Sequence, residues 1–214
     1  MVKHMRTFLP VFLVLPVFLA GQNFEGKMFF SKESPKDTSF YCYNWKDHFL
    51  RLDEFTESGR LKSYVIFNFS DKTVTAVSPA QKLCMRIPEK DITIPVKNND
   101  IEIIHSGNHK NILGYECYQY RIKHKKANTE IAYWLADLEI EYFKEFLKMS
   151  GRVEKSAGYY FLLPDGDGRF PLLSTERNIF RDIRLRLRVT AIEKQHLSAD
   201  LFSIPEGYHF FQEK

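Results

Sequence analysis

The amino-acid sequence predicts a mainly β fold: a curved antiparallel sheet, or open half-barrel, with one amphipathic lid helix at about residues 137–150. Three observations predict it. Apolar and polar residues alternate over most of the chain, as they do in strands that are buried on one face. Short turn signals separate the alternating segments, which is typical of hairpins. One segment instead carries apolar residues at the helical spacing of three and four.

The first 22 residues have the pattern of a secretory signal peptide. They contain no acidic residue, begin with Lys3 and Arg6, continue with an apolar run and end in small residues. The run is too short to span a bilayer comfortably, which takes about 20 residues. We therefore expect a signal peptide at residues 1–22 and a single antiparallel-sheet domain at residues 23–214, exported to the periplasm or secreted, with no transmembrane span. The alternative is an uncleaved N-terminal anchor.

The net charge limits the kinds of partner that we expect, and the three cysteines raise the question of a disulfide. The whole chain has a formal charge of +4, and removal of Lys3 and Arg6 leaves a small surplus, so no nucleic-acid partner is expected. Export permits a disulfide among Cys42, Cys84 and Cys117. The sequence does not choose a pair, and three buried thiols remain the alternative.

The first half of the domain reads as hairpin strands at residues 24–31, 40–45, 48–55, 61–69, 73–77 and 82–87. Because strand residues two apart point to the same face, we expect three same-face groups: Met28 with Phe30, Tyr41 with Tyr43, and Val65 with Phe67. The sequence is rich in rings, with 19 Phe and 11 Tyr, and many of them fall on such alternating positions. We therefore expect aromatic side chains to line one face of the sheet.

The second half is less uniform. Residues 88–100 are polar and irregular, which indicates a surface excursion. Strands are expected at residues 101–104, 115–123, 129–135, 159–163 and 179–192, then a helical turn at 197–202 and a tail that folds back.

The predicted helix begins at Asp137, whose side chain suits an N-cap, and it ends before Gly151. Glu139 and Glu141 in its first turn suit the helix dipole. Its apolar stripe consists of Leu138, Tyr142, Phe143, Phe146, Leu147 and Met149. We expect this stripe to cover the sheet rather than to bind a partner.

No motif predicts catalysis, a cofactor or a metal. His105 and His109 have a zinc-like spacing but lack accompanying ligands, and the residues between them read as a turn. Residues 165–168 begin like a calcium loop, but Arg169 stands where the loop needs a ligand. Cys117 has no activating histidine nearby in sequence. We therefore expect a protein that is not an enzyme.

Arg184, Arg186 and Arg188 lie on one face of the last long strand, about 7 Å apart. Three guanidinium groups in a row could hold a phosphate, a lipid headgroup or an acidic partner. The simpler interpretation, which we favour, is a solvated outer face whose arginines pair with carboxylates such as Glu130 on neighbouring strands.

Short motifs along the chain resemble a known family. They are Asn-Phe-Glu-Gly at residues 23–26, Gly-Tyr-Glu-Cys-Tyr-Gln-Tyr at 114–120, Tyr-Trp at 133–134, and Leu-Phe-Ser-Ile-Pro-Glu-Gly-Tyr at 201–208. Their order resembles domain-of-unknown-function family 4412, exported bacterial proteins with the predicted architecture of periplasmic lipoprotein carriers (lipoprotein-localisation-factor-like). The resemblance implies a curved sheet around a helical lid with a hydrophobic cavity, and it transfers no catalytic residue. Residues 88–100 and the basic final strand match no feature of the family.

We therefore expect a non-catalytic carrier or binding module for a lipid, an acyl chain or a lipoprotein-like apolar ligand. The expected lining residues are Met28, Phe30, Tyr41, Tyr43, Val65, Phe67 and Phe146. The alternative is a structural or interaction module of the envelope with a filled core, for which a cavity below about 300 Å³ would speak. A third hypothesis, an uncharacterised hydrolase, would need polar groups converging in a cleft.

Overall fold

The computed structural model describes residues 23–88, 92–151, 154–164 and 168–211. The expected signal peptide at residues 1–22 lies outside this part of the chain, as do Asp165 and Asp167 of the calcium-like turn. The elements are β1 (Gly26–Glu33), β2 (Thr38–Lys46), β3 (Phe49–Phe55), β4 (Leu61–Asn68), β5 (Thr73–Ser78), β6 (Leu83–Ile87), β7 (Ile101–Ile112), β8 (Tyr115–His124), β9 (Thr129–Ala136), α1 (Phe143–Met149), α2 (Lys155–Tyr160), β10 (Phe170–Asn178), β11 (Ile183–Lys194), the 3₁₀ turn η1 (Ala199–Phe202) and β12 (His209–Phe210).

The strands of the described residues form one twelve-stranded sheet in the order β12-β6-β5-β4-β3-β2-β1-β11-β10-β9-β8-β7. The strands from β1 to β6 make one meander and those from β7 to β11 make another, and β1 joins them by pairing with β11. All neighbours are antiparallel except β12, which pairs parallel to β6. The predicted mainly β fold is confirmed.

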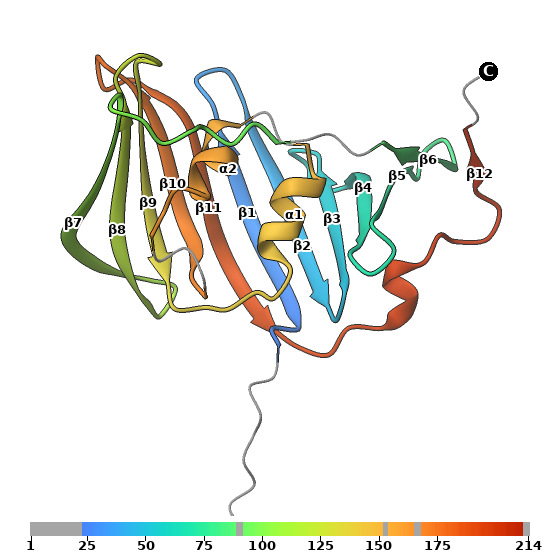
Figure 1. The fold of residues 1–214 in the computed structure, drawn as a ribbon. Coiled ribbons are helices and arrows are strands. Elements are labelled where there is room, and N and C mark those ends of the chain that lie inside the picture. Colours follow the sequence, from blue (N-terminus) through green and yellow to red (C-terminus); the bar gives the residue numbers. More distant parts are fainter. Residues whose placement is uncertain (1–22, 89–91, 152–153, 165–167, 212–214) are drawn as a thin grey trace, which may run out of the picture.

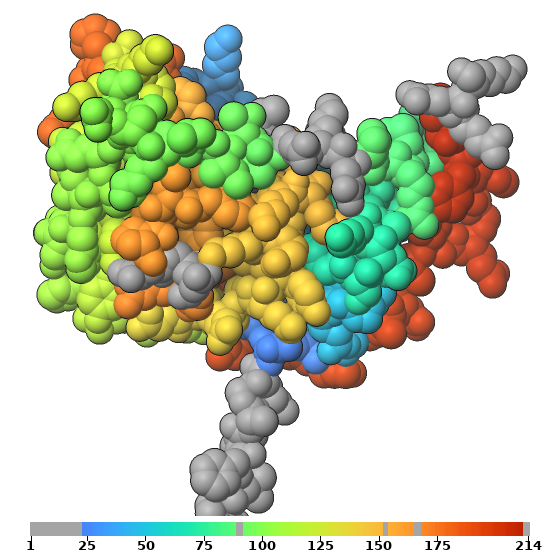
Figure 2. Space-filling view, viewed as in Figure 1, coloured from blue at the N-terminus to red at the C-terminus, as the bar shows by residue number. Residues whose placement is uncertain are grey.

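Both helices lie against one face of the curved sheet, which we call the concave face (Figure 1). They occupy the centre of the face shown in Figure 2. The strands send their alternating apolar residues toward them, including Met28, Tyr43, Leu50 and Phe67, all of them buried. The main core therefore lies between the helices and the concave face, where the sequence predicts an aromatic lining.

The segment at residues 92–100, called the strap below, crosses α2 on its way from β6 to β7 (Figure 1). It has to cross because these consecutive strands lie near opposite edges of the sheet. The strap packs closely on α2: a Cβ added at Gly158 would lie 2.3 Å from the backbone oxygen of Thr93. Glycine at position 158 therefore permits this contact.

The C-terminal segment covers part of the opposite, convex face. Tyr64, Ile66, Val77 and Cys84 form a second buried cluster there, against Ile204 and Tyr208. Arg51 holds the segment in place: its Nη1 donates to the backbone oxygen of Leu201 at 3.0 Å, and its guanidinium stacks 3.7 Å from the centre of the Tyr64 ring. The expected helical turn and returning tail are thus present.

The lid helix is shorter than the predicted 137–150. The helix α1 begins after Tyr142, so Asp137 is not its N-cap, and Glu139 and Glu141 are not in its first turn. The predicted start is wrong because Leu138 and Ile140, two residues apart, are both buried in a non-helical segment. Gly151 follows the helix with a positive φ of 54°, in agreement with the predicted end.

The structure corrects further parts of the predicted strand assignment. Residues 159–163 do not form a strand, because Tyr159 and Tyr160 end α2; this six-residue helix is buried on nearly all sides and so has no amphipathic period. The strand β10, which begins at Phe170, has no counterpart in the prediction. Residues 106–108 are not a turn but an irregularity within β7, so His105 and His109 belong to one strand. Residues 179–182, predicted to begin the last long strand, instead form the turn before β11.

The three cysteines are free, buried thiols on separate strands. Burial raises the pKa of Cys42 to about 12 and also raises the pKa of Cys117. Since the thiolate is the reactive form, we expect no rapid reaction with Ellman's reagent at pH 8 in the folded protein. All three thiols should react in denaturant. A fast-reacting thiol in the native state, or a missing thiol in the denatured state, would contradict this arrangement.

Candidate functional site

A cavity of about 280 Å³ lies between the two helices and the concave face. Its lining is mostly aliphatic and aromatic, and the residues come from both meanders. They are Phe30, Lys32, Tyr41, Tyr43, Leu52, Val65, Phe67, Val74, Ile87, Tyr133, Phe143, Phe146, Leu147, Met149, Ser150, Glu154, Ser156, Ala157, Tyr160, Phe170, Pro171, Ser174 and Leu187. The volume falls just below the lower end of the range for drug-sized ligands, so the space suits a slender ligand.

Stacked and edge-on rings build the floor of the cavity. Phe146 of α1 meets Tyr43 with ring centres 5.5 Å apart and Phe67 at 5.2 Å, both edge-on. Phe30 lies 4.2 Å from Tyr43 on the neighbouring strand. These spacings are those of favourable aromatic pairs, so the floor is a fixed surface rather than a loose collection of side chains.

An ion pair stands among the apolar residues of the cavity. The Lys32 Nζ lies 2.6 Å from the Glu154 Oε1, which joins the end of β1 to the residue before α2. The Glu154 side chain is 13% exposed and that of Lys32 is 32% exposed. Lys32 is the more exposed partner, and we call its end of the cavity the mouth.

Tyr133 of β9 connects the sheet to α2 through a hydrogen bond. Its hydroxyl donates to the backbone oxygen of Ser156 at 2.7 Å, and burial raises the pKa of this phenol well above its ordinary value. The hydroxyl therefore stays protonated over the whole physiological range and keeps its donor role. This bond fixes the height of α2 above the sheet and with it one wall of the cavity.

The structure brings together most of the expected lining residues. Phe30, Tyr41, Tyr43, Val65, Phe67 and Phe146 line the cavity. Met28 does not: its side chain is fully buried within the core.

Sequence reasoning missed the polar part of the lining. Lys32 lies two residues after Phe30, so strand alternation alone places it on the same face, but its charge suggested solvent. Glu154 and Tyr160 belong to the α2 segment, whose brevity left no pattern. Phe170 was missed together with β10.

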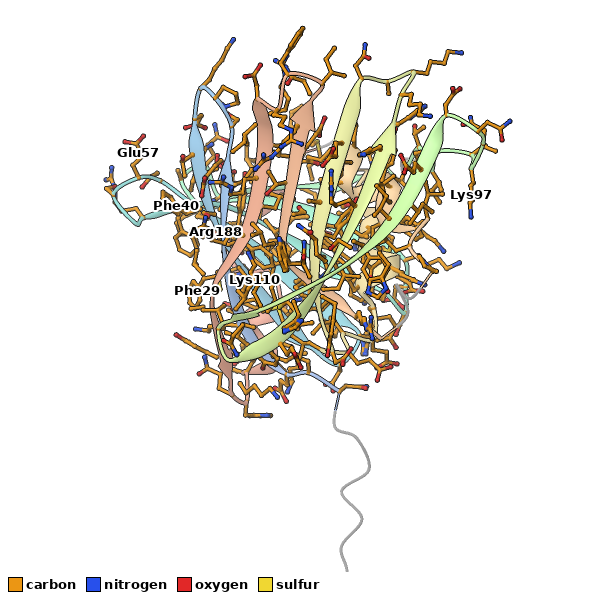
Figure 3. All side chains as sticks on the ribbon, turned by 90° about the vertical axis from the view of Figure 1, so that its left-hand side faces the viewer. Phe29, Phe40, Glu57, Lys97, Lys110 and Arg188 are labelled. Atoms are coloured by element: carbon orange, nitrogen blue, oxygen red, sulfur yellow. The ribbon has the colours of Figure 1, made fainter. Side chains whose placement is uncertain are left out.

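The arginine row lies on the convex face of β11, away from the helices. Arg184 and Arg188 are exposed, and the Arg186 Nη1 lies 3.0 Å from the Glu33 Oε2. The expected carboxylate Glu130 instead pairs with Arg121. In Figure 3, Arg188 lies near Lys110, whose pKa is lowered, first by burial and then by Arg188 and Arg186.

We expect replacement of Arg184, Arg186 and Arg188 by Gln to change binding to anionic liposomes by less than about twofold. Arg186 is neutralised by Glu33, and the two exposed arginines, Arg184 and Arg188, lie about 13 Å apart along the strand, where charges are screened at ordinary salt. Liposome sedimentation of the full chain measures the effect. Unchanged binding rejects an anion-binding role for the row, whereas a loss of about tenfold or more would establish one.

The described residues contain no group of three His, Cys, Asp or Glu side chains placed to hold a metal ion. His105 stacks on Tyr120 with ring centres 4.6 Å apart, which gives it a packing role. Within the described ranges, no helix is long and apolar enough to cross a membrane.

Comparison with known proteins gives a family and a fold. A family profile described as "Domain of unknown function (DUF4412)" matches residues 24–208. No curated protein matches the chain. Among solved structures, an uncharacterized conserved protein from Thermus thermophilus is similar over 88% of this chain and 91% of its own, with 7% identity and a TM-score of 0.51.

Two further structures are more distant. MucB matches 85% of this chain and 58% of its own length at 11% identity, with a TM-score of 0.47. PNGF-II matches 87% of this chain and 30% of its own at 9% identity, with a TM-score of 0.43. At such identities the likeness concerns the fold alone.

Proposed function

This chain belongs to the DUF4412 family, whose description assigns no activity, and we propose from its own cavity that it is an exported, non-catalytic carrier of an acyl chain or a similar slender apolar ligand. The observation that carries the proposal is the cavity of about 280 Å³ between helices and sheet. Such a space is large for a core that serves packing alone, because protein interiors are packed about as densely as organic crystals.

The chemistry of the lining supports an amphipathic ligand. Aromatic and aliphatic side chains form the floor, and burial of a hydrocarbon chain against them is favourable by about 25 cal/mol per Å² of apolar surface. The ion pair of Lys32 and Glu154 supplies the few polar groups that orient a ligand in an otherwise apolar site. The bound compound therefore has an apolar chain directed toward Phe146 and a polar end toward Lys32.

Mass spectrometry of the purified protein tests the proposal. The full chain is purified from its native envelope without detergent, and its lipids are extracted and identified. We expect an acyl compound in a near-constant ratio to protein. A protein that is repeatedly empty, and that fails to bind palmitate in a calorimetric titration, overturns the proposal.

A cavity-filling variant tests the same site in vitro. Val65 lines the cavity, so Val65→Trp places an indole where the ligand lies, and palmitate binding should weaken at least about tenfold. Val96→Trp is the matched control, because Val96 is 81% exposed and lies outside the lining. Equal palmitate binding by the two variants contradicts a ligand in this cavity.

The second candidate is a structural or interaction module of the envelope whose core holds no ligand. The observation that favours it is the cavity volume, which is slightly below that of drug-sized sites. This candidate predicts that Val65→Trp raises the melting temperature by filling space and changes no binding. The palmitate titration therefore separates the two candidates directly.

A further inference from the structure

The turn between β10 and β11 exposes two large apolar side chains side by side. Ile179 is 62% exposed and Phe180 is 78% exposed. The turn lies at the end of the sheet where the β8–β9 turn also lies (Figure 1), and it protrudes at the upper left of the space-filling view, in orange (Figure 2). Adjacent exposed apolar residues on a protruding turn are unfavourable in water unless a partner covers them.

Hydrogen bonds hold this turn in one conformation. Asn178 and Asp182 close it: the Asn178 Nδ2 donates to the Asp182 Oδ2 at 2.9 Å, and the Asp182 backbone N–H donates to the Asn178 Oδ1 at 2.9 Å. The backbone N–H of Arg181 donates to the oxygen of Asn178 at 3.0 Å. The turn thus holds Ile179 and Phe180 away from the protein body. Because the turn is already ordered, inserting these two side chains into a binding partner costs little conformational entropy.

Cationic side chains share this end of the sheet with the two apolar residues. Asn178 pairs with Thr129 in the sheet register, so the β8–β9 and β10–β11 turns are neighbours. The backbone N–H of Lys125 donates to the backbone oxygen of Asp100. We call the two turns, together with Asp100, the tip surface. Its cations outnumber its carboxylates; the cations are Lys125, Lys126 and Arg181, and the carboxylates are Asp100 and Asp182.

We propose that the tip surface docks on an anionic lipid bilayer, with Ile179 and Phe180 in the interfacial layer and the cations against headgroup phosphates. Exposed apolar residues among basic ones are the combination that binds anionic membranes. A protein partner fits less well, because a stable protein interface covers about 800 Å² on each side, and a protruding two-residue apolar tip offers no such face. A bilayer accommodates a protrusion without a matching shape.

The proposal is independent of a ligand in the cavity, but it gives the cavity a direction. Lys32, at the mouth, is one residue from the end of β1 and pairs in register with Leu187 of β11. Leu187 lies in the half of β11 that begins at the tip surface. Docking by the tip surface therefore turns the mouth of the cavity, rather than its floor, toward the membrane.

Vesicle flotation with the full chain tests the proposal. The probes are vesicles of phosphatidylcholine and phosphatidylglycerol in equal parts, and vesicles of phosphatidylcholine alone. We expect binding to the anionic vesicles that weakens with salt. Ile179→Ser together with Phe180→Ser should reduce it at least about tenfold, and Lys125→Glu together with Lys126→Glu should remove the preference for phosphatidylglycerol.

The matched control is Phe210→Ser together with Phe211→Ser, which removes two exposed apolar side chains, 48% and 57% exposed, at β12 and beyond. This control should bind vesicles as the unchanged protein does. Each of these outcomes overturns the proposal: no binding to anionic vesicles, an equal loss of vesicle binding in the control, or full vesicle binding by the Ile179/Phe180 variant. The proposal is also overturned if the tip surface binds another protein and the chain does not bind vesicles. Vesicle results leave the palmitate titration unaffected, so the two proposals fail separately.

Discussion

Phe146→Ala is expected to lower the free energy of unfolding by about 3–5 kcal/mol, the range for removal of a buried aromatic ring. Phe146 is 1% exposed and is the residue of α1 whose ring packs on strands β2 and β4. Its ring is within 6.0 Å of the centre of Trp45 and closer to those of Tyr43 and Phe67. Alanine removes these contacts and leaves a void that joins the existing cavity, because rings held by the two strands β2 and β4 cannot collapse into it.

Urea unfolding followed by tryptophan fluorescence measures this loss. Phe40→Ala is the matched control: Phe40 is 44% exposed and lies on the convex face near Phe29 (Figure 3), so its removal should change stability by less than about 1 kcal/mol. A loss below about 1 kcal/mol for Phe146→Ala would show that α1 is not anchored through this ring. Equal losses in the two variants would contradict the assignment of the core to the concave face.

Gly158→Ala is expected to destabilise the protein by about 1–3 kcal/mol, the usual cost of overpacking. Helix propensity alone predicts the opposite sign, because alanine is favoured over glycine inside a helix by about 1 kcal/mol. The close approach decides the outcome, since the new Cβ would lie 2.3 Å from the backbone oxygen of Thr93. A backbone atom cannot rotate away, so either the strap or α2 has to move.

Limited proteolysis distinguishes this displacement from a general loss of stability. Lys97 is an exposed residue of the strap (Figure 3), and trypsin should cleave after it faster in Gly158→Ala under native conditions. Gly207→Ala serves as the control, because its Cβ would meet no atom within 4 Å and only its positive φ of 80° adds strain. A stabilised Gly158→Ala protein would mean that strap and helix do not touch.

The sequence predicts the sheet well because strand alternation is a local signal. One-sided burial in β1, β2 and β4 was readable from Phe30, Tyr43 and Phe67, and these residues do face the helices. The pattern fails where burial is not one-sided. Helix α2 is buried from Ser156 to Tyr160, so it shows no polar face and no period.

The site was predictable only in its apolar part. The pairing of Lys32 with Glu154 joins residues 122 positions apart, and no local pattern contains such a contact. The tip surface was missed for the opposite reason: Ile179 was assigned to a strand, where an apolar residue needs no explanation, and only its exposure in the folded chain sets it apart. Local periodicity thus identifies elements, whereas sites depend on their assembly.

The junction between β1 and β11 has a consequence for folding. Each meander is built from sequence neighbours, but Gly26 meets Lys194 only after nearly the whole domain is available. Contacts between distant chain segments close late and slowly, because the chain entropy of closing a long loop is lost before the contacts form. We therefore expect the two meanders to be the early folding units and their junction to form late. A polypeptide that completes its central strand pair last stays incompletely folded until the final strands are present. Until then it can still be threaded through a channel.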